Sequence, residues 1–258
     1  MEITLDLNKS IEENASSYFE KAKKAKKKLL GAQEAAEQTR KRIEQLERKK
    51  EKELAAIKKE SVRKREKKWY EKFRWFHSSE GFLVIGGRDA TTNEIIIKKH
   101  TNDDDIVFHT DMAGSPFFVV KTVGKKVGEA TLKEAAQATA SYSRAWKLGL
   151  GTSDVFYVKP SQVTKEAKAG EFMPKGAFMI KGKTTYIRPE IKLAIGEKNG
   201  EIIGGPVDSI KKQTKNFVVI VQGAKKPSEV AKKIRAKLGG DIDEIIRMLP
   251  AGGCEIEK

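Results

Sequence analysis

The hydrophobic pattern of this chain changes character near residue 69. From Ser10 to Arg74 the sequence has no proline and a single glycine, Gly31, in a background of Ala, Glu, Lys, Arg and Gln. These residue types have high helix propensity, so the pattern predicts one long helix with at most a brief interruption. Its sparse apolar residues approximate a heptad seam: Leu29, Ala36, Ile43, Leu46, Leu54 and Ile57. Because Lys50 and Glu53 stand where the seam should be apolar, we expect a coiled coil that is weak or contains a stutter.

An aromatic cluster, WYEKFRWF at residues 69–76, follows this segment. Four of its rings have the three- and four-residue spacings of one helical face: Trp69, Tyr70, Phe73 and Phe76. This spacing predicts that the helix ends in a globular core. Since Lys72 and Arg74 are interleaved with the rings, stacking on RNA bases is the alternative interpretation.

Short strand-like runs begin at Gly81. The first four are FLVIGG, EIIIK, DIVFH and FFVVK, and turn formers separate them, which predicts an antiparallel meander. Helical periodicity over residues 131–149 predicts one helix that covers the sheet and ends at Gly149. Further strands are expected at VFYVK, AFMIK, TTYI, IKLAI and FVVIV. Two helices, SEVAKKIRAKLG and DIDEIIRML, then follow with Ser228 and Asp241 as expected N-caps.

The predicted fold class is α+β, because strands and helices are partly segregated along the chain. We expect a long basic helical or coiled-coil arm at 1–68, followed by a mostly antiparallel sheet domain with covering helices at 69–196. Residues 197–258 are predicted to add a strand and helices packed on or beside that domain.

Composition and charge indicate what kind of partner the chain binds. Of the 258 residues, 38% are hydrophobic and 34% are charged, and the net charge is +16. Residues 21–75 hold 22 Lys and Arg against 9 Asp and Glu, a surplus of 13. So large a surplus favours a polyanionic partner such as nucleic acid, with an acidic membrane surface or a solvated helix face as competing interpretations. No run of about 18 apolar residues and no signal-peptide core occurs, so we expect a cytoplasmic protein without membrane contact.

The sequence offers little for catalysis. NDDDIVFHTDMAGS gathers acidic residues around His109, and strand alternation would place Asp105, His109 and Asp111 on one face. This set could bind a divalent cation or pair a histidine with a carboxylate, but it matches none of the standard metal-ligand spacings. The structural interpretation is favoured, so we expect no enzyme, no catalytic residue, no metal and no cofactor. An RNA-processing enzyme at His109 and Asp111 is the alternative.

Three other segments offer phosphate contacts. The run Gly86-Gly87-Arg88-Asp89 resembles a tight turn that could present backbone donors and an arginine to phosphate. KGAFMIKGK and RAWK place further cations on a strand and a helix. The predicted nucleic-acid contacts, including cations around the aromatic cluster, are Lys67, Lys68, Lys72, Arg74, Arg88, His109, Arg144, Lys147, Lys175, Lys181 and Lys183.

Long motifs in these same segments carry a resemblance to a known family. LDLNKSIEENASSYFEKAKKAKKK is followed by WYEKFRWFHSSEGFLVIGGRDATTNEIIIKKH and DIVFHTDMAGSP, and then by TLKEAAQATASYSRAW, VFYVKPSQVTKEAKAGEF and KGAFMIKGKTTYI. Together they resemble the middle coiled coil and the RNA-binding domain of the NFACT (RqcH/NEMF) family, over about residues 3–190. The Lys- and Glu-rich composition is similar to that of archaeal members.

The resemblance implies a role in ribosome-associated quality control. Members recognise large ribosomal subunits obstructed by peptidyl-tRNA and recruit tRNA to extend the trapped chain with a C-terminal tail. The implied partners are therefore the large subunit, rRNA and tRNA, with self-association through the helical arm as a further expectation. The family's amino-terminal domain has no counterpart in this sequence, so binding without tailing is expected. A surface fibronectin-binding adhesin, a stand-alone nucleic-acid-binding protein and a protein-docking rod are the alternatives.

The resemblance also bears on individual residues. Eukaryotic relatives carry a histidine where this sequence has Ala113, which weakens a metal or catalytic role for His109 and Asp111. Besides the KGAFMIKGK lysines, the positions that match the family's motifs as surface or scaffold candidates are Trp69, Phe73, Trp75, Gly86, Gly87, Arg88, Asp89, His109, Asp111 and Gly114.

Overall fold

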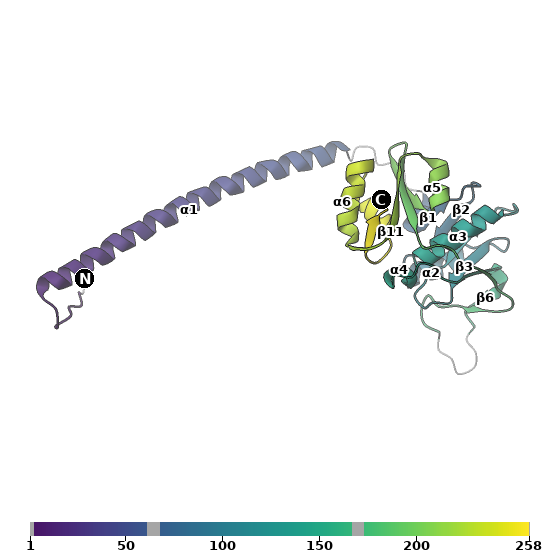
Figure 1. Cartoon of the computed structure of the whole chain (residues 1–258), viewed down its shortest axis with the longest axis horizontal. Helices are drawn as coiled ribbons and strands as arrows, with labels where there is room; N and C mark the ends of the chain where they lie inside the picture. Colours follow the sequence, from purple (N-terminus) through teal and green to yellow (C-terminus); the bar gives the residue numbers. More distant parts are fainter. Residues whose placement is uncertain (1–2, 61–67, 167–172, 258) are drawn as a thin grey trace. The chain divides into compact units, whose positions relative to one another are not determined.

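The computed structural model describes residues 3–60, 68–166 and 173–257 (Figure 1). The chain divides into two compact units, Met1–Glu66 and Lys67–Lys258. The predicted boundary after residue 68 lies close to this division. The second predicted boundary, after residue 196, falls inside one strand, β9 (Leu193–Lys198).

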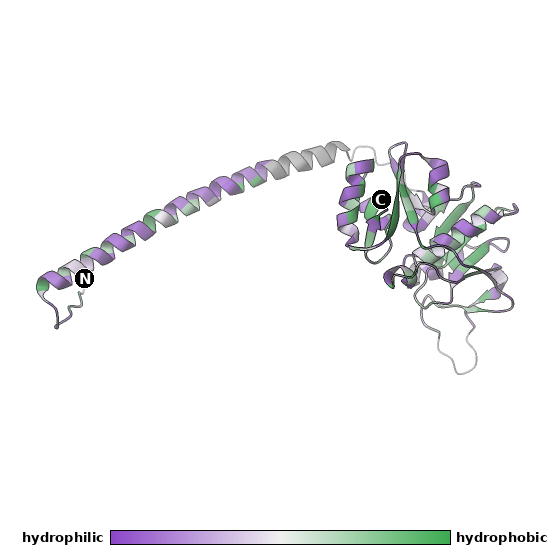
Figure 2. Ribbon diagram, in the orientation of Figure 1, coloured by the Kyte–Doolittle hydropathy of each residue, from purple (hydrophilic) through white to green (hydrophobic). Residues whose placement is uncertain are grey.

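The first unit contains one long helix, α1 (Ile11–Glu60), as predicted. A reciprocal pair of hydrogen bonds starts it, because Glu13 N donates to Ser10 Oγ over 3.1 Å and Ser10 N donates to Glu13 Oε2 over 2.8 Å. Figure 2 shows scattered apolar residues on a mostly hydrophilic helix. In the described part of the seam, Leu29, Ile43 and Leu46 are exposed. The side chains of residues 49–60, which include the later seam positions, lie outside the described residues, and the coiled coil stays a prediction.

A six-stranded antiparallel sheet organises the second unit. Its hydrogen-bonded strands lie in the order β1-β2-β4-β3-β5-β8. The strands are β1 (Arg74–His77), β2 (Leu83–Gly86), β4 (Phe118–Lys121), β3 (Ile106–Thr110), β5 (Val155–Val158) and β8 (Thr185–Ile187). A short two-stranded ladder, β6 (Val163–Thr164) with β7 (Met179–Ile180), follows the 3-10 turn η3 (Pro160–Gln162). The antiparallel arrangement confirms the predicted α+β class.

Strand alternation sends side chains from this sheet into two cores. On one face Val84 belongs to a cluster with four buried alanines of α3 (Glu129–Ser141). On the other face Ile85 packs in a cluster with Ile96 of α2 (Ala90–Lys99) and with Tyr70 of the 3-10 turn η2 (Trp69–Lys72). Both faces are therefore covered, which is why these strands are almost continuously apolar.

Two of the predicted elements have a different form. The aromatic cluster is not one helix, because η2 ends at Phe73 and residues 74–77 pair with β2 as β1. Tyr70, Phe73 and Phe76 are buried as expected, whereas Trp69 remains 49% exposed. The EIIIK run is part of α2 and not a strand. A capping box between Asp89 and Thr92 starts that helix and overrides the strand preference of three consecutive isoleucines.

The predicted helix over residues 131–149 is interrupted. α3 ends at Ser141, and α4 (Arg144–Lys147) begins after a new cap, because Ser143 Oγ accepts from Ala145 N over 3.1 Å. The expected glycine stop is confirmed, since Gly149 has a φ of 72°.

A four-stranded antiparallel sheet completes the second unit. Its order is β10-β9-β11-β12, with β10 (Glu201–Gly205), β11 (Phe217–Lys225) and β12 (Cys254–Ile256) beside β9. Ile210 of α5 (Val207–Gln213) packs with Ala194 of β9, while Ile195 of β9 belongs to the cluster that also buries α6 (Pro227–Leu238) and α7 (Ile242–Met248). Asp241 caps α7 as predicted. Ser228 does not cap α6, because Pro227 already occupies the first turn. Over the described residues, no helix is long and apolar enough to cross a membrane.

Candidate nucleic-acid interface

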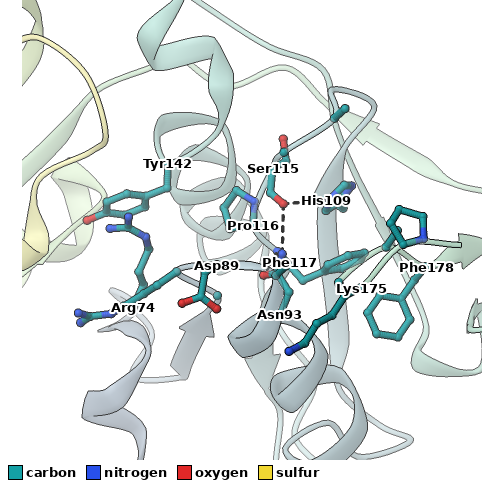
Figure 3. Close-up of a pocket in the computed structure, with 18 residues that line it drawn as sticks. Arg74, Asp89, Asn93, His109, Ser115, Pro116, Phe117, Tyr142, Lys175 and Phe178 are labelled. Atoms are coloured by element: carbon teal, nitrogen blue, oxygen red, sulfur yellow. Dashed lines mark hydrogen bonds between the residues drawn. The ribbon is translucent and has the colours of Figure 1, made fainter.

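A cavity of about 380 Å³ lies where the β2–α2 connection, the β3–β4 loop and residues 174–178 meet (Figure 3). It brings together four of the predicted contact residues: Arg74, Arg88, His109 and Lys175. These residues lie far apart in the sequence, on β1, on the β2–α2 connection, on β3 and on the loop before β7.

Gly87 shapes the loop that leads into the cavity. A Cβ on Gly87 would lie 1.8 Å from Asn93 Oδ1, so only glycine fits there. The backbone donors of this loop are already used, because Gly87 N donates to Phe117 O over 3.0 Å and Arg88 N donates to Thr92 Oγ1 over 2.8 Å. The expectation that this turn offers its backbone amides to phosphate is therefore wrong, and the Arg88 side chain is its remaining contribution.

Two arginines form the cationic end of the cavity. The Arg74 guanidinium lies 4.0 Å from the centre of the Tyr142 ring, and Tyr142 is fixed because its hydroxyl donates to Met248 O over 2.6 Å. Arg88 Nη2 donates to Phe73 O over 3.0 Å. Arg74 Nη1 and Arg88 Nε are both buried, and neither has a hydrogen-bond partner among the residues that the structure describes.

The pKa values of both arginines are lowered. Burial is the main cause for each, because removing water disfavours the charged form. The nearby charges of Arg74 and Arg247 lower the pKa of Arg88 further. The guanidiniums remain charged at neutral pH, so the cavity concentrates positive charges that repel one another.

A hydrogen-bonded wall faces this cationic end. The buried Asn93 side chain accepts from Phe117 N over 3.1 Å and donates to Ser115 O over 3.4 Å. His109 stacks on Phe117 at 4.1 Å between ring centres, and its Nε2 lies 3.2 Å from Ser115 O. Burial lowers the pKa of His109, so the ring is neutral at physiological pH. His109 therefore contributes a flat surface to the cavity and no positive charge.

The mouth of the cavity carries charges of both signs. Lys175 and Asp89 are exposed there. Backbone hydrogen bonding from Thr92 is the largest cause that lowers the pKa of Asp89, and Lys175 lowers it by its charge. Asp89 Oδ1 accepts from Thr92 N over 2.8 Å as the N-cap of α2. Three cations therefore line the cavity against one carboxylate.

The other predicted contact residues lie away from this cavity. Lys72 Nζ lies 4.9 Å from the centre of the Phe73 ring, beside Trp69, which stacks on His100 at 4.7 Å. Lys181 pairs with Glu166 over 2.6 Å. Lys68 and Lys183 are exposed on separate elements, Arg144 and Lys147 are exposed on α4, and Lys67 falls outside the described residues. The contact set as a whole stays a prediction.

The acidic candidates around His109 do not converge. Asp105 is buried and hydrogen bonds Lys121 Nζ, and its Oδ1 accepts from Thr122 N over 3.1 Å. Asp111 accepts from the Tyr186 hydroxyl over 3.3 Å. Within the described ranges, no group of three or more His, Cys, Asp or Glu side chains is placed to hold a metal ion. The structural interpretation fits the partners of these carboxylates.

Several lining residues were not anticipated from the sequence. Tyr142 lies within the helix predicted over residues 131–149, and Asn93 lies beside the predicted EIIIK strand, so neither is a candidate contact in the sequence. Phe178 was read as part of a strand, although it lines the cavity and meets Phe117 edge to face at 5.3 Å. Asn93 is a polar residue that is buried in α2, and buried polar groups usually have a specific role in hydrogen bonding. Its burial is seen only in the structure, so the sequence gives no signal for it.

Comparison with known proteins matches this part of the chain to a family. Residues 72–182 match the NFACT protein RNA binding domain. The chain is 47% identical over 208 residues to the archaeal Rqc2 homolog aRqcH of Methanocaldococcus jannaschii, covering 78% of this chain and 31% of that protein. It is 39% identical over 178 residues to the human ribosome quality control complex subunit NEMF, covering 68% of this chain and 16% of that protein. The chain thus spans a third or less of the length of these relatives.

A solved structure is also similar in part. The C-terminal of the fibronectin/fibrinogen-binding protein from Streptococcus suis matches with a TM-score of 0.40 and 17% identity, covering 51% of this chain and 48% of that chain. A likeness at this level carries no argument about function.

Proposed function

Because this chain carries the RNA-binding domain of the NFACT family, we propose that it is the RNA- and ribosome-binding module of a ribosome quality control factor. One observation supports this proposal above the others. The four cavity residues Arg74, Arg88, His109 and Lys175 all lie within residues 72–182, which match the RNA-binding domain. The module acts by binding and does not catalyse a reaction. Its association with ribosomes would place it in the cytoplasm.

The proposed partners are the large ribosomal subunit, rRNA and tRNA. Relatives at 28–39% identity are named as ribosome quality control complex subunits, which supports association with ribosomes. Recognition of subunits obstructed by peptidyl-tRNA and recruitment of tRNA for tailing are activities proposed for the longer protein. The net charge of +16 supports an electrostatic contribution that gives affinity and on-rate without base specificity.

Co-sedimentation over a salt series tests this function. The purified chain is mixed with empty large subunits, with large subunits bearing peptidyl-tRNA, and with intact ribosomes. We expect binding that falls steeply with salt, because phosphate contacts release counterions. Preference for the peptidyl-tRNA complex would support recognition within this chain, whereas equal binding to all three would assign it general rRNA affinity. Absence of binding at low salt would contradict the proposal.

Incubation with RNA tests the absence of catalysis. Labelled rRNA and tRNA fragments are incubated with the chain, with and without divalent cations, and analysed by gel electrophoresis. We expect unchanged RNA. Metal-dependent cleavage that His109→Ala abolishes would favour an enzyme at His109 and Asp111.

A further inference from the structure

The two unpartnered arginine N–H groups point to a missing acceptor. Buried polar groups are almost always hydrogen bonded, and a buried donor left without a partner costs roughly 1–3 kcal/mol. Here Arg74 Nη1 and Arg88 Nε are both left in this state, and both arginines line the same cavity. Their proximity adds repulsion between like charges. An anion between them would satisfy both donors and remove that repulsion.

The geometry favours an anion with several oxygen atoms. A guanidinium presents its donors as a planar fork that matches phosphate and carboxylate oxygens. Asp89 already occupies the N-terminus of α2, so the helix end is not available for the anion. The arginines, with Lys175 at the mouth, would therefore hold it. Asp89 opposes this binding by its charge, but three cations outweigh one carboxylate.

The opposite end of the cavity suits a flat, partly apolar group. His109, Phe117 and Phe178 line this end, and Figure 3 shows them across the cavity from Arg74. Lys165 Nζ lies 4.9 Å from the centre of the Phe178 ring and pairs with Glu94 over 3.6 Å, so its charge beside the ring is partly offset. Aromatic surfaces of this kind stack on unpaired bases, and a cavity of about 380 Å³ is within the size range of small-ligand sites.

We propose that this cavity binds one unpaired RNA nucleotide, with its phosphate on Arg74 and Arg88 and its base against Phe178. This assignment rests on the proposed RNA-binding function and gives it a site. A base in a double helix is stacked between its neighbours and does not reach a recessed cavity, so the site selects single-stranded, bulged or terminal nucleotides. The rest of the basic surface would bind RNA without this selectivity.

Adenosine monophosphate is the direct probe of this site in the full chain. Two-dimensional proton–nitrogen NMR spectra resolve the arginine Nε–H groups, and the unpartnered Arg88 Nε–H is expected to shift when the nucleotide is added. Arg74→Gln and Arg88→Gln should each weaken nucleotide binding about ten-fold or more, because each loses a charge-assisted hydrogen bond. Arg235→Gln is the matched control, because it removes an exposed arginine of α6 that neither lines the cavity nor belongs to the predicted contacts. Inorganic phosphate should compete, and adenosine without phosphate should bind more weakly.

A second variant guards against effects on folding. Lys175 is exposed, so Lys175→Gln should leave the thermal unfolding midpoint unchanged and still weaken nucleotide binding several-fold. A short single-stranded RNA and a hairpin duplex are then compared with all four variants. The cavity variants should lose the preference for the single strand while keeping duplex affinity close to that of Arg235→Gln.

The outcomes separate this inference from the proposed function. If the chain binds RNA but adenosine monophosphate causes no shift, or if the cavity variants match Arg235→Gln, the cavity assignment is overturned and the RNA-binding function stands. If adenosine monophosphate binds but neither RNA nor ribosomes do, the proposed function fails, and with it the assignment of an RNA nucleotide to the cavity.

Discussion

At the scale of single residues, Asp89 has two effects that can be separated. Its carboxylate caps α2 through Thr92, and it places a negative charge at the mouth of a cationic cavity. Asparagine is about as good an N-cap as aspartate but carries no charge. Asp89→Asn should therefore keep the free energy of unfolding within about 0.5 kcal/mol and tighten binding of single-stranded RNA by about three- to ten-fold at low salt.

Chemical denaturation and fluorescence anisotropy check these two expectations. Asp89→Ala is the control for the cap, and we expect it to lower the free energy of unfolding by about 1 kcal/mol because Thr92 N loses its acceptor. Unchanged RNA affinity in Asp89→Asn at low salt would show that no anion binds near this carboxylate.

Because His109 is buried, we expect the free energy of unfolding to depend on pH. Burial lowers its pKa below the ordinary value of 6.5, so the unfolded chain takes up a proton at a higher pH than the folded chain. In the window below 6.5 the unfolded state binds more protons, and the free energy of unfolding therefore falls as the pH is lowered through that window. Between about pH 7.5 and about pH 5.5, the chain should lose more stability than the His109→Gln variant.

This comparison isolates one residue among several that titrate. The pKa values of His77 and His100 are also lowered, and that of Glu134 is raised, so the pH profile of the unchanged chain alone is a sum. Urea denaturation of both proteins at the two pH values gives the difference directly. Parallel pH profiles would mean that His109 is accessible to water and protons in the folded state.

At the scale of secondary-structure elements, Gly86 is a sensitive point of the six-stranded sheet. It pairs with Phe118 across β2 and β4, and a Cβ there would lie 2.3 Å from the Phe118 ring. Phe118 is fully buried and has no room to move. Gly86→Ala should lower the free energy of unfolding by roughly 1–3 kcal/mol, measured by urea denaturation.

Gly151 offers the matched control for this substitution. An added Cβ at Gly151 meets no atom within 4 Å, so Gly151→Ala should change the free energy of unfolding by no more than about 0.5 kcal/mol. Equal free energies of unfolding for the two variants would contradict this prediction. They would show that the sheet makes room for a Cβ between Gly86 and the Phe118 ring.

The sequence predicted correctly those elements whose hydrophobic pattern fits only one type of secondary structure. Apolar runs between turn formers, such as β2 and β4, were correct because the sheet buries both of their faces. The strand predicted at EIIIK was wrong. The isoleucines have a high β propensity, but the N-cap at Asp89 starts a helix that includes them. The ring spacing of residues 69–76 also fits a 3-10 turn followed by a strand. Arg74, Arg88, His109 and Lys175 could be singled out by residue type, but their convergence depends on sheet pairing that spans the domain and that no local pattern reveals.

At the scale of the whole molecule, the charge is shared between the two compact units. Residues 1–66 hold 19 Lys and Arg against 13 Asp and Glu, a surplus of 6. Residues 67–258 hold 33 against 23, a surplus of 10. Residues 1–20 hold one Lys against five Asp and Glu, which offsets part of the basic run in the first unit, and the rest of that run, residues 67–75, belongs to the second unit. The second unit therefore has the larger net positive charge.

Removal of residues 1–66 tests which unit binds RNA. The hydrophobic clusters of the described core lie within residues 67–258, so this part should fold alone with an unchanged thermal midpoint. We expect it to keep adenosine monophosphate binding and most of its affinity for single-stranded RNA, while the slope of log affinity against log salt becomes shallower, because fewer cations reach the phosphates. If RNA affinity is lost with residues 1–66 while nucleotide binding remains, the long helix supplies the electrostatic attraction and the cavity supplies only selectivity for unpaired nucleotides.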